Sequence, residues 1–215
     1  KSLHQISDTT RDRINKKWSE KIDSVLNKNT LNIVAGYNRP PFMFDKTSKK
    51  GIELDLASKA LVLAGYKIGD IQQVSFKKAS HILQKNKNID VAVSVEKVKD
   101  SGLFYSEPFI GFDNVVVTRK KDKLTINSVD DLVDKTVVTW INANKVLGPR
   151  FHELFKEGAP TRTEKYRELR DQVEQHGTFF TEQAEAIIVD RTIFDWQKHN
   201  FKDQLNIDEE YDIHT

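Results

Sequence analysis

Residues 31–44 read LNIVAGYNRPPFMF. The run begins as an apolar strand and then passes through Tyr37, Arg39, two prolines and Phe42. It therefore predicts a buried strand whose carboxyl end presents an aromatic side chain and a cation. Ligands bind at the carboxyl ends of strands in open α/β sheets. The stretch thus indicates an α/β fold with a ligand site at this edge.

The composition allows a substantial core and argues against a nucleic-acid-binding surface. The chain has 215 residues, of which 38% are hydrophobic, which is enough for one large domain or two small lobes. Lys and Arg number 34 against 32 Asp and Glu, and the two signs are interspersed throughout, whereas nucleic-acid binding needs clustered basic residues. The densest basic run, RKKDK at residues 119–123, contains Asp122 and is predicted to be a solvated turn.

Several kinds of chemistry lack their residues in this sequence. The chain has no cysteine, which excludes disulfides, thiolate catalysis and cysteine-ligated zinc. Its six histidines form no His-x-x-x-His pair, so neither a metal site nor a cofactor is predicted. No nucleophile elbow, phosphate loop or dinucleotide fingerprint occurs, and Glu185 and Asp190 are expected on opposite faces of one strand. We therefore predict no catalytic residues.

The start of the sequence suggests that the chain is a piece of a longer protein. It begins at Lys1, its single methionine is Met43, and no apolar run is as long as the 18 residues that a membrane-spanning helix requires. We therefore expect a processed or excised piece, with any export signal or membrane anchor outside it.

Hydrophobic periodicity predicts an opening helix followed by alternating strands and helices. Residues 2–26 carry one helical stripe of apolar side chains. After the first strand, helices are predicted over 54–65 and 77–84 and strands over 71–74, 89–95 and 114–118. Alternation of this kind favours a parallel or mixed sheet covered by helices.

A second, similar unit is predicted after the basic turn. Ser128 caps a short helix, a strand follows over 136–140, and Asn142 stands where the next helix should begin. A charged helix is predicted over 166–175. The strand over 186–189 then ends at Asp190 and leads into a last helix.

Six short motifs, taken in order, resemble those of bacterial extracytoplasmic solute-binding proteins of family 3, which include the flytrap sensor domains of bacterial receptors. They cover about residues 31–201 and are Pro41-Phe42, Gly51-Ile52-Glu53-Leu54-Asp55-Leu56, Asn88-Ile89-Asp90, Tyr105-Ser106-Glu107-Pro108-Phe109, Leu132-Val133-Asp134-Lys135 and Ala184-Glu185-Ala186-Ile187-Ile188-Val189-Asp190.

This resemblance implies an α/β fold of the two-lobed periplasmic-binding-protein type II, or Venus flytrap, with a central mixed sheet in each lobe. Residues 1–29 then form an N-terminal amphipathic segment, 30–117 form lobe 1 and 118–203 form lobe 2. Residues 204–215 begin the return crossing to lobe 1. The lobes of such proteins close over a small polar ligand.

The resemblance and the strand ends together predict seven ligand-binding residues: Tyr37, Arg39, Phe42, Ser94, Trp140, Asn142 and Asp190. Amino-acid-binding relatives hold a carboxylate with an arginine that this chain lacks between Asp90 and Tyr105, so Arg39 is considered a relocated anion clamp. Lys97 or Lys99 is the alternative. Several candidates also have a structural interpretation: Phe42 as a core residue, Trp140 as core packing, and Asp190 as a pair with Arg191 or a helix cap.

The predicted function is capture of a small polar or charged solute, an amino acid or a similar molecule, between the two lobes in the periplasm or another extracytoplasmic space. The module would serve uptake by a membrane permease or act as the sensor domain of a transmembrane receptor. No nucleic-acid partner is expected, and binding without catalysis is the main interpretation. The alternative is a dehydratase-type enzyme that uses the same cleft. The identity of the ligand, the choice between transport and sensing, and the oligomeric state stay open.

Overall fold

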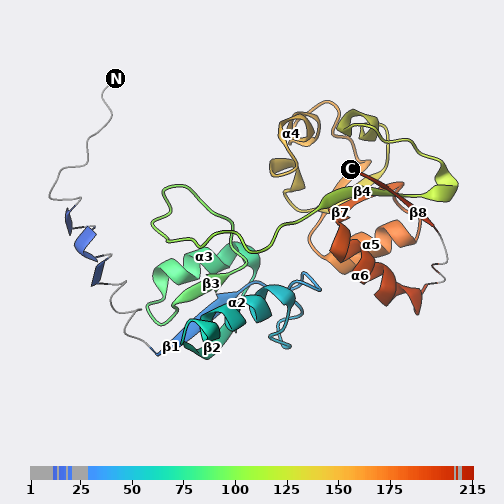
Figure 1. Cartoon of the computed structure of the whole chain (residues 1–215). Helices are drawn as coiled ribbons and strands as arrows, with labels where there is room; N and C mark the ends of the chain where they lie inside the picture. The colour runs from blue at the N-terminus through green and yellow to red at the C-terminus, as the bar shows by residue number, and fades with distance from the viewer. Residues whose placement is uncertain (1–11, 14, 18, 21–28, 206, 208–209) are drawn as a thin grey trace, which may run out of the picture. The chain divides into compact units, whose positions relative to one another are not determined.

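The computed structural model describes residues 12–13, 15–17, 19–20, 29–205, 207 and 210–215. They form two compact units (Figure 1). Unit 1 takes in the described residues of Lys1–Tyr37 and Met43–Ser106, and unit 2 those of Asn38–Phe42 and Glu107–Thr215. Of the helix predicted over 2–26, the described residues are helical, and the rest of that prediction lies outside them.

Unit 1 is a parallel sheet between two helices. Its strands are β1 (Thr30–Ala35), β2 (Lys67–Gln73) and β3 (Val91–Val93), in the order β2-β1-β3, and its helices are α2 (Ile52–Leu63) and α3 (Phe76–Lys85). Both pairings of β1 are parallel, so the prediction of a mixed sheet does not apply to the described strands of this unit. Because the strands are parallel, all three carboxyl ends lie at one edge of the sheet.

Alternate residues of β1 supply the two cores of unit 1. Ile33 and Ala35 pack with Leu54 of α2, whereas Val34 packs with Ala79 of α3. Each face of the sheet is thus covered by a different helix. A strand buried on both faces reads as a continuous apolar run, as the opening stretch of the sequence does.

Asn32 secures an irregularity where β1 meets β2. Its side-chain oxygen accepts a hydrogen bond from the backbone N–H of Asp70 at 2.8 Å, and its amide nitrogen donates to the carbonyl of Asn88 at 2.9 Å. A Cβ on Gly69 would lie 2.2 Å from that Asn32 oxygen. The register of β1 against β2 shifts at this point, between Leu31 and Ile33. Glycine is required here because the Asn32 side chain occupies the space.

Unit 2 is built on a five-stranded mixed sheet of order β6-β5-β7-β4-β8. Strands β5, β6 and β7 run parallel, and β4 is antiparallel to both β7 and β8. The elements in chain order are β4 (Asn114–Arg119), η1 (Lys120–Asp122), η2 (Val129–Leu132), β5 (Val137–Trp140), η3 (Ala143–Lys145), α4 (Pro149–Phe155), β6 (Tyr166–Leu169), α5 (Gln172–Phe180), β7 (Ala186–Asp190), α6 (Arg191–Lys202) and β8 (Tyr211–His214).

The sheet of unit 2 also has two apolar faces. On one, Val138 and Ile187 pack with Phe179 of α5 and Phe194 of α6. On the other, the core contains Val137 and Ile188 of the sheet and three aromatic side chains, Phe151, Phe155 and Tyr166. Burial of aromatic and branched apolar side chains on both faces is the main stabilising contribution to such a layered unit.

The α5 helix carries a buried histidine on its core-facing side. His176 has no exposed surface, and its Nδ1 lies 2.7 Å from the carbonyl oxygen of Gln172. That carbonyl can only accept, so Nδ1 is the protonated nitrogen of the ring. Burial lowers the pKa of His176 to about 4, an effect that the hydrogen bond to the Gln172 carbonyl opposes.

Two predicted features of unit 2 differ in the structure. The helix predicted over 166–175 is wrong, because Tyr166–Leu169 pairs with β5 and only then does Asp171 cap α5, accepting from the backbone N–H groups of Val173 and Glu174. Pairing with a neighbouring strand here outweighs the helix propensity of the sequence. The boundary predicted after residue 117 also moves, since β4 pairs with β7 and β8 and lies wholly in unit 2.

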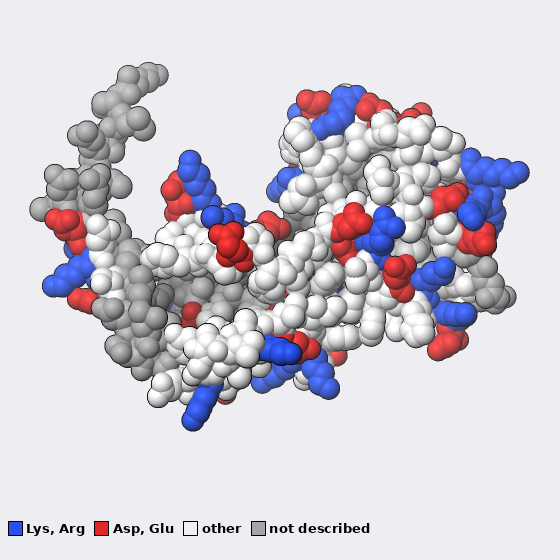
Figure 2. Space-filling model, viewed as in Figure 1, with Lys and Arg blue, Asp and Glu red and all other residues white. Residues whose placement is uncertain are grey.

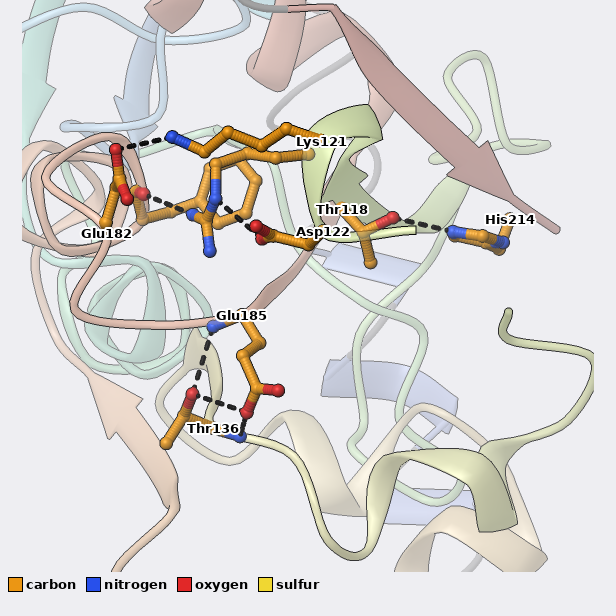
Figure 3. Close-up of polar contacts among 9 residues, drawn as sticks. Thr118, Lys121, Asp122, Thr136, Glu182, Glu185 and His214 are labelled. Carbon is orange, nitrogen blue, oxygen red and sulfur yellow. Dashed lines mark hydrogen bonds and ion pairs between the residues drawn. The ribbon is translucent and has the colours of Figure 1, made fainter. Parts of the chain in front are cut away.

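Several connections in unit 2 are held by side-chain hydrogen bonds, as Figure 3 shows. Glu185 Oε2 accepts from both the backbone N–H (2.7 Å) and the hydroxyl (2.9 Å) of Thr136. These bonds outweigh burial and keep the pKa of Glu185 below its ordinary value. Thr118 Oγ1 lies 2.9 Å from His214 Nε2, which joins β4 to β8. The predicted cap at Ser128 is present as a reciprocal capping box with Asp131.

Candidate functional site

The carboxyl edge of the unit 1 sheet brings together residues from all three strands. Ala35 at the end of β1 pairs with Gln73 at the end of β2 and with Val93 at the end of β3. Tyr37 follows β1 and Ser94 follows β3. We call Tyr37, Gln73, Phe76 and Ser94 the unit 1 edge. Two of these, Tyr37 and Ser94, are predicted from the sequence.

The ring of Phe76 packs against the backbone at the unit 1 edge. A Cβ on Gly36 would lie 2.1 Å from the Phe76 ring, so the ring rests directly on the chain at the end of β1. Phe76 is the first residue of α3 and is half-buried. Sequence reasoning missed Phe76. Gly36 was the available signal, because a glycine at a strand end marks the close approach of another group.

Ser94 has the most unusual backbone at the unit 1 edge. Its φ is 67°, in the left-handed region that residues other than glycine rarely adopt. Its hydroxyl oxygen is buried and has no hydrogen-bond partner among the described residues. An unfavourable backbone conformation and an unsatisfied buried hydroxyl each cost stability, and such features cluster at functional sites.

Gln73 is a second polar side chain at the unit 1 edge that the sequence did not predict. It is 6% exposed, and both atoms of its amide are buried without a hydrogen-bond partner in the part of the chain that the structure describes. Burial of an amide without partners costs about 1–3 kcal/mol. A glutamine at the end of a strand carries no signal of its own in the sequence, because only the tertiary fold shows that it is buried.

Arg39 and Phe42 belong to unit 2 rather than to the unit 1 edge. Phe42 is 6% exposed and lies in the unit 2 core, with its ring edge-on to Phe112 at 4.9 Å. The guanidinium carbon of Arg39 stands 4.5 Å from the centre of the same Phe112 ring. The structural interpretation of Phe42 therefore holds, and its side chain is a core residue. Arg39 makes a cation–π contact, which Arg forms readily.

Asp190 is a helix cap in this structure. One of its carboxylate oxygens accepts from the backbone N–H groups of Thr192 (2.9 Å) and Ile193 (3.1 Å), the first turn of α6. The other accepts from the N–H of Asp113 at 2.8 Å. The side chain is 4% exposed. Both oxygens are thus used to hold the backbone together, as expected for an N-cap aspartate.

Asn142 follows Trp140 at the end of β5 and turns the chain. Its φ is 65°, and its side chain makes no capping hydrogen bond to η3, so the predicted amide cap is absent. The long helix of this region begins later, at Pro149 of α4. Asparagine suits the left-handed position because its short polar side chain tolerates it. Trp140 is partly buried and packs against the core shared with α4, which is its structural interpretation.

Glu168 of β6 fixes the loop that Asn142 begins. Its carboxylate accepts from the backbone N–H of Asn142 (3.1 Å) and from Tyr166 Oη (2.9 Å), and the amide of Asn144 donates to it at 2.5 Å. Burial pushes the pKa of Glu168 upward, but these hydrogen bonds and the Arg162 guanidinium outweigh it, so the pKa lies below its ordinary value. We call Asp190, Glu168 and the residues that they hold the unit 2 edge.

Charge and metal-ligand patterns add no further site among the described residues. Figure 2 shows basic and acidic side chains interspersed on the face in view. No group of three His, Cys, Asp or Glu side chains among the described residues is placed to hold a metal ion. Within those same residues no helix has both the length and the apolar character needed to span a bilayer.

Comparison with solved structures identifies the class of fold. The chain is similar to an ancestral arginine-binding protein bound to arginine, with a TM-score of 0.63, 19% identity and coverage of 87% of this chain and 79% of that one. It is also similar to the substrate-binding protein of an amino acid ABC transporter, with a TM-score of 0.57, 20% identity and coverage of 86% and 78%.

A third similar structure is an ancestral amino acid-binding protein described as a precursor of cyclohexadienyl dehydratase. Its TM-score is 0.60 at 18% identity, with coverage of 90% of this chain and 81% of that one. No protein-family model and no curated protein sequence matches the chain. The chain thus has the two-lobed α/β fold of type II periplasmic binding proteins, as the sequence motifs predicted.

Proposed function

We propose that the chain is an extracytoplasmic solute-binding module that captures a small polar or charged solute without transforming it. The similar solved structures, which include proteins for arginine and other amino acids, support the class of ligand. A permease or the transmembrane part of a receptor is the expected partner. Fold alone does not decide function, so the proposal rests on the residues of the unit 1 edge.

The observation that carries the proposal is the set of unsatisfied polar groups at the unit 1 edge. The Ser94 hydroxyl and the Gln73 amide are buried without partners in the described part of the chain, and Ser94 has an unfavourable left-handed backbone. Both lie where strands of a parallel sheet end, and the ring of Phe76 rests on Gly36 at the same edge. A polar ligand with hydrogen-bond donors and acceptors would satisfy such groups.

The ligand class is tested by a thermal-shift screen with amino acids, polyamines, small carboxylates and sugar acids. A ligand present at about 100 times its dissociation constant raises the free energy of unfolding by roughly 2.7 kcal/mol. We expect at least one compound of these classes to raise the melting temperature. The shift should shrink in Gln73→Ala and in Ser94→Ala.

The matched control is Ser80→Ala, which changes the same residue type on α3 of unit 1, away from the strand ends. It should leave the ligand-induced shift unchanged. The proposal fails if no compound shifts the melting temperature, or if Gln73→Ala and Ser94→Ala bind as tightly as the original chain.

The alternative function is a dehydratase that uses the same fold, which the likeness to the dehydratase precursor brings to attention. Acid–base chemistry needs a carboxylate that is available to a substrate. Glu185 and Asp190, the two carboxylates considered in the sequence, hold Thr136 and the start of α6. Incubation of the chain with prephenate-like and arogenate-like acids distinguishes the alternatives. Formation of a product would support the dehydratase and contradict the proposal of binding without catalysis.

A further inference from the structure

Gln73 ends β2 in the same row of the unit 1 sheet as Ala35 of β1 and Val93 of β3. Ala35 and Val93 face the core that contains Leu54 of α2, and so does Ile71, two residues before Gln73. Because side chains alternate between the faces of a strand, Gln73 faces this core as well. The side chains of Ala35 and Val93 have no hydrogen-bonding groups. The Gln73 amide therefore enters an apolar layer of unit 1.

The Gln73 amide carries two kinds of unused hydrogen-bonding group. The residue is 6% exposed, and its Oε1 and Nε2 are both buried without a partner among the described residues. A primary amide holds an acceptor oxygen and an N–H donor side by side in one plane. The same holds for either orientation of the amide, because both atoms lack partners. A group that satisfies it must accept and donate at once.

This requirement separates three kinds of ligand group. A carboxylate only accepts, so it can pair with Nε2 but brings a second oxygen against Oε1. An ammonium or guanidinium group only donates, so it can pair with Oε1 but leaves Nε2 unpaired. An uncharged amide or ureide has a carbonyl beside an N–H and can pair with both atoms. Since an unpaired buried group is costly, the amide or ureide is the best complement.

The sequence around the strand ends also suits an uncharged ligand group. The residues directly after the three strands are Gly36-Tyr37-Asn38, Val74-Ser75-Phe76 and Ser94-Val95, with no Asp, Glu, Lys, Arg or His among them. A charged group held by these residues would lose its hydration without gaining a countercharge from them. The Ser94 hydroxyl can donate or accept. The Phe76 ring packs against the same core that Gln73 faces and adds apolar surface.

We propose that the unit 1 edge binds an uncharged amide of the solute, a carboxamide or a ureide, and that Gln73 selects it. The inference rests on the proposed function, because it names the chemistry of the solute that this edge holds. Gln73 is then the residue of this edge that determines specificity.

Two matched pairs of compounds test the ligand class. Glutamine and glutamate differ in a carboxamide against a carboxylate, and citrulline and arginine differ in a ureide against a guanidinium. Calorimetric titration of the full chain measures the dissociation constant of each compound. We expect glutamine and citrulline to bind at least about tenfold more tightly than their charged partners, because each charged group leaves one atom of the Gln73 amide unpaired.

Variants of Gln73 test its role in the selection. Gln73→Glu makes the side chain an acceptor only, so arginine should then bind more tightly than citrulline. Gln73→Met removes both polar atoms at similar size, so both binding ratios should fall toward one, and it serves where the buried carboxylate of Gln73→Glu prevents folding. Gln72→Glu is the matched control, since Gln72 is the exposed neighbour on β2, and it should leave both ratios unchanged.

The outcomes distinguish this inference from the proposed function. If glutamate or arginine binds as tightly as its uncharged partner, the inference is wrong, whereas capture of a solute stands. The same conclusion follows if none of the four compounds binds while another compound of the thermal-shift screen does. If no compound binds in either experiment, both proposals fail.

A last outcome concerns Gln73 alone. A buried water molecule can also donate and accept, and it would satisfy the Gln73 amide without any ligand. Unchanged binding ratios in Gln73→Met would support such a water and overturn selection by Gln73.

Discussion

The unit 1 edge and the unit 2 edge occupy equivalent positions in their own sheets but use their polar residues differently. At the unit 2 edge Asp190 accepts three backbone hydrogen bonds and Glu168 holds Asn142, Asn144 and Tyr166. At the unit 1 edge the Gln73 amide and the Ser94 hydroxyl are buried and unsatisfied within the described part of the chain.

This difference shows that a polar residue at a strand end is not by itself a ligand contact. Asp190 is the most prominent candidate in the sequence, yet its bonds make it part of the scaffold. Gln73 carries no signal in the sequence, yet its environment lacks partners. Whether a polar group is satisfied within the fold separates the two kinds of residue, because a buried polar group that is left unsatisfied costs stability.

The largest effect is expected from Asp190→Ala. The change removes the α6 cap and leaves the N–H groups of Asp113, Thr192 and Ile193 without their acceptor, so the free energy of unfolding of unit 2 should fall by about 2–3 kcal/mol. Urea denaturation followed by Trp140 and Trp196 fluorescence, in a Trp18→Phe background, measures it. Asp113→Asn, at an exposed ion pair with Arg191, is the control. An unchanged midpoint in Asp190→Ala would contradict the role of Asp190 as a helix cap and would leave ligand contact as its predicted role.

Acidification should weaken unit 2 through His176. The unfolded chain takes up a proton at about pH 6.5, whereas the folded chain does so only at about pH 4. The unfolded state therefore binds more protons between these values, and the free energy of unfolding falls as the pH is lowered from 6.5 to 4, by on the order of 2–3 kcal/mol.

The same fluorescence-monitored denaturation, repeated across this pH range, checks the prediction. His176→Gln should flatten the dependence, whereas His152→Gln, at an exposed histidine of α4, should not. An equally steep dependence in His176→Gln would assign the effect to other groups.

Glu168→Gln tests the second anchor of the unit 2 edge with a smaller expected effect. The substitution keeps the size of the side chain but removes the charge that the Asn142 N–H, Asn144, Tyr166 and Arg162 face. We expect a loss of about 1–2 kcal/mol. Glu164→Gln, at an exposed position of the preceding loop, should change stability by less than about 0.5 kcal/mol. Equal effects would show that Glu168 is no anchor.

The smallest effect is expected at the unit 1 edge and has the opposite sign. Ser94→Gly relieves the left-handed backbone and removes the unsatisfied hydroxyl, so we expect unit 1 to gain up to about 1 kcal/mol while ligand binding weakens. Circular dichroism and calorimetric titration measure the two quantities. Lys123→Gly relieves a similar φ of 50° in unit 2 and should not affect binding. If Ser94→Gly made unit 1 less stable, the inference that Ser94 is unfavourable for stability at the unit 1 edge would be wrong.

Much of the fold could be predicted from local patterns. The helices corresponding to α2 and α3, the strands corresponding to β1, β4, β5 and β7, and the Ser128 cap were predicted because periodicity and capping are local properties. The strand Tyr166–Leu169 was missed because it forms by pairing with β5, which its own residues do not reveal. Its Arg, Glu and Leu residues have good helix propensity.

The candidate site was predictable only in part. Tyr37 and Ser94 were predicted to follow apolar strands, and they do, whereas their contact with a ligand stays a prediction. Phe42 was predicted beside Tyr37, but its ring lies in the unit 2 core against Phe112. Gln73 and Phe76 were missed because nothing in the sequence shows that an amide is unsatisfied, and Gly36 was the only sign that a ring approaches.

The sequence by itself determined the α/β architecture, most of the order of strands and helices, and the edge of the sheet at which a ligand would be expected. These features follow from the apolar periodicity of short stretches and from the alternation of strands with helices along the chain. The tertiary structure decided which polar groups are satisfied within the fold. Asp190 and Glu168 accept backbone hydrogen bonds, whereas the Ser94 hydroxyl and the Gln73 amide are buried and have no hydrogen-bond partner among the described residues. Hydrogen bonding and burial depend on residues distant in the chain, and only folding brings those together.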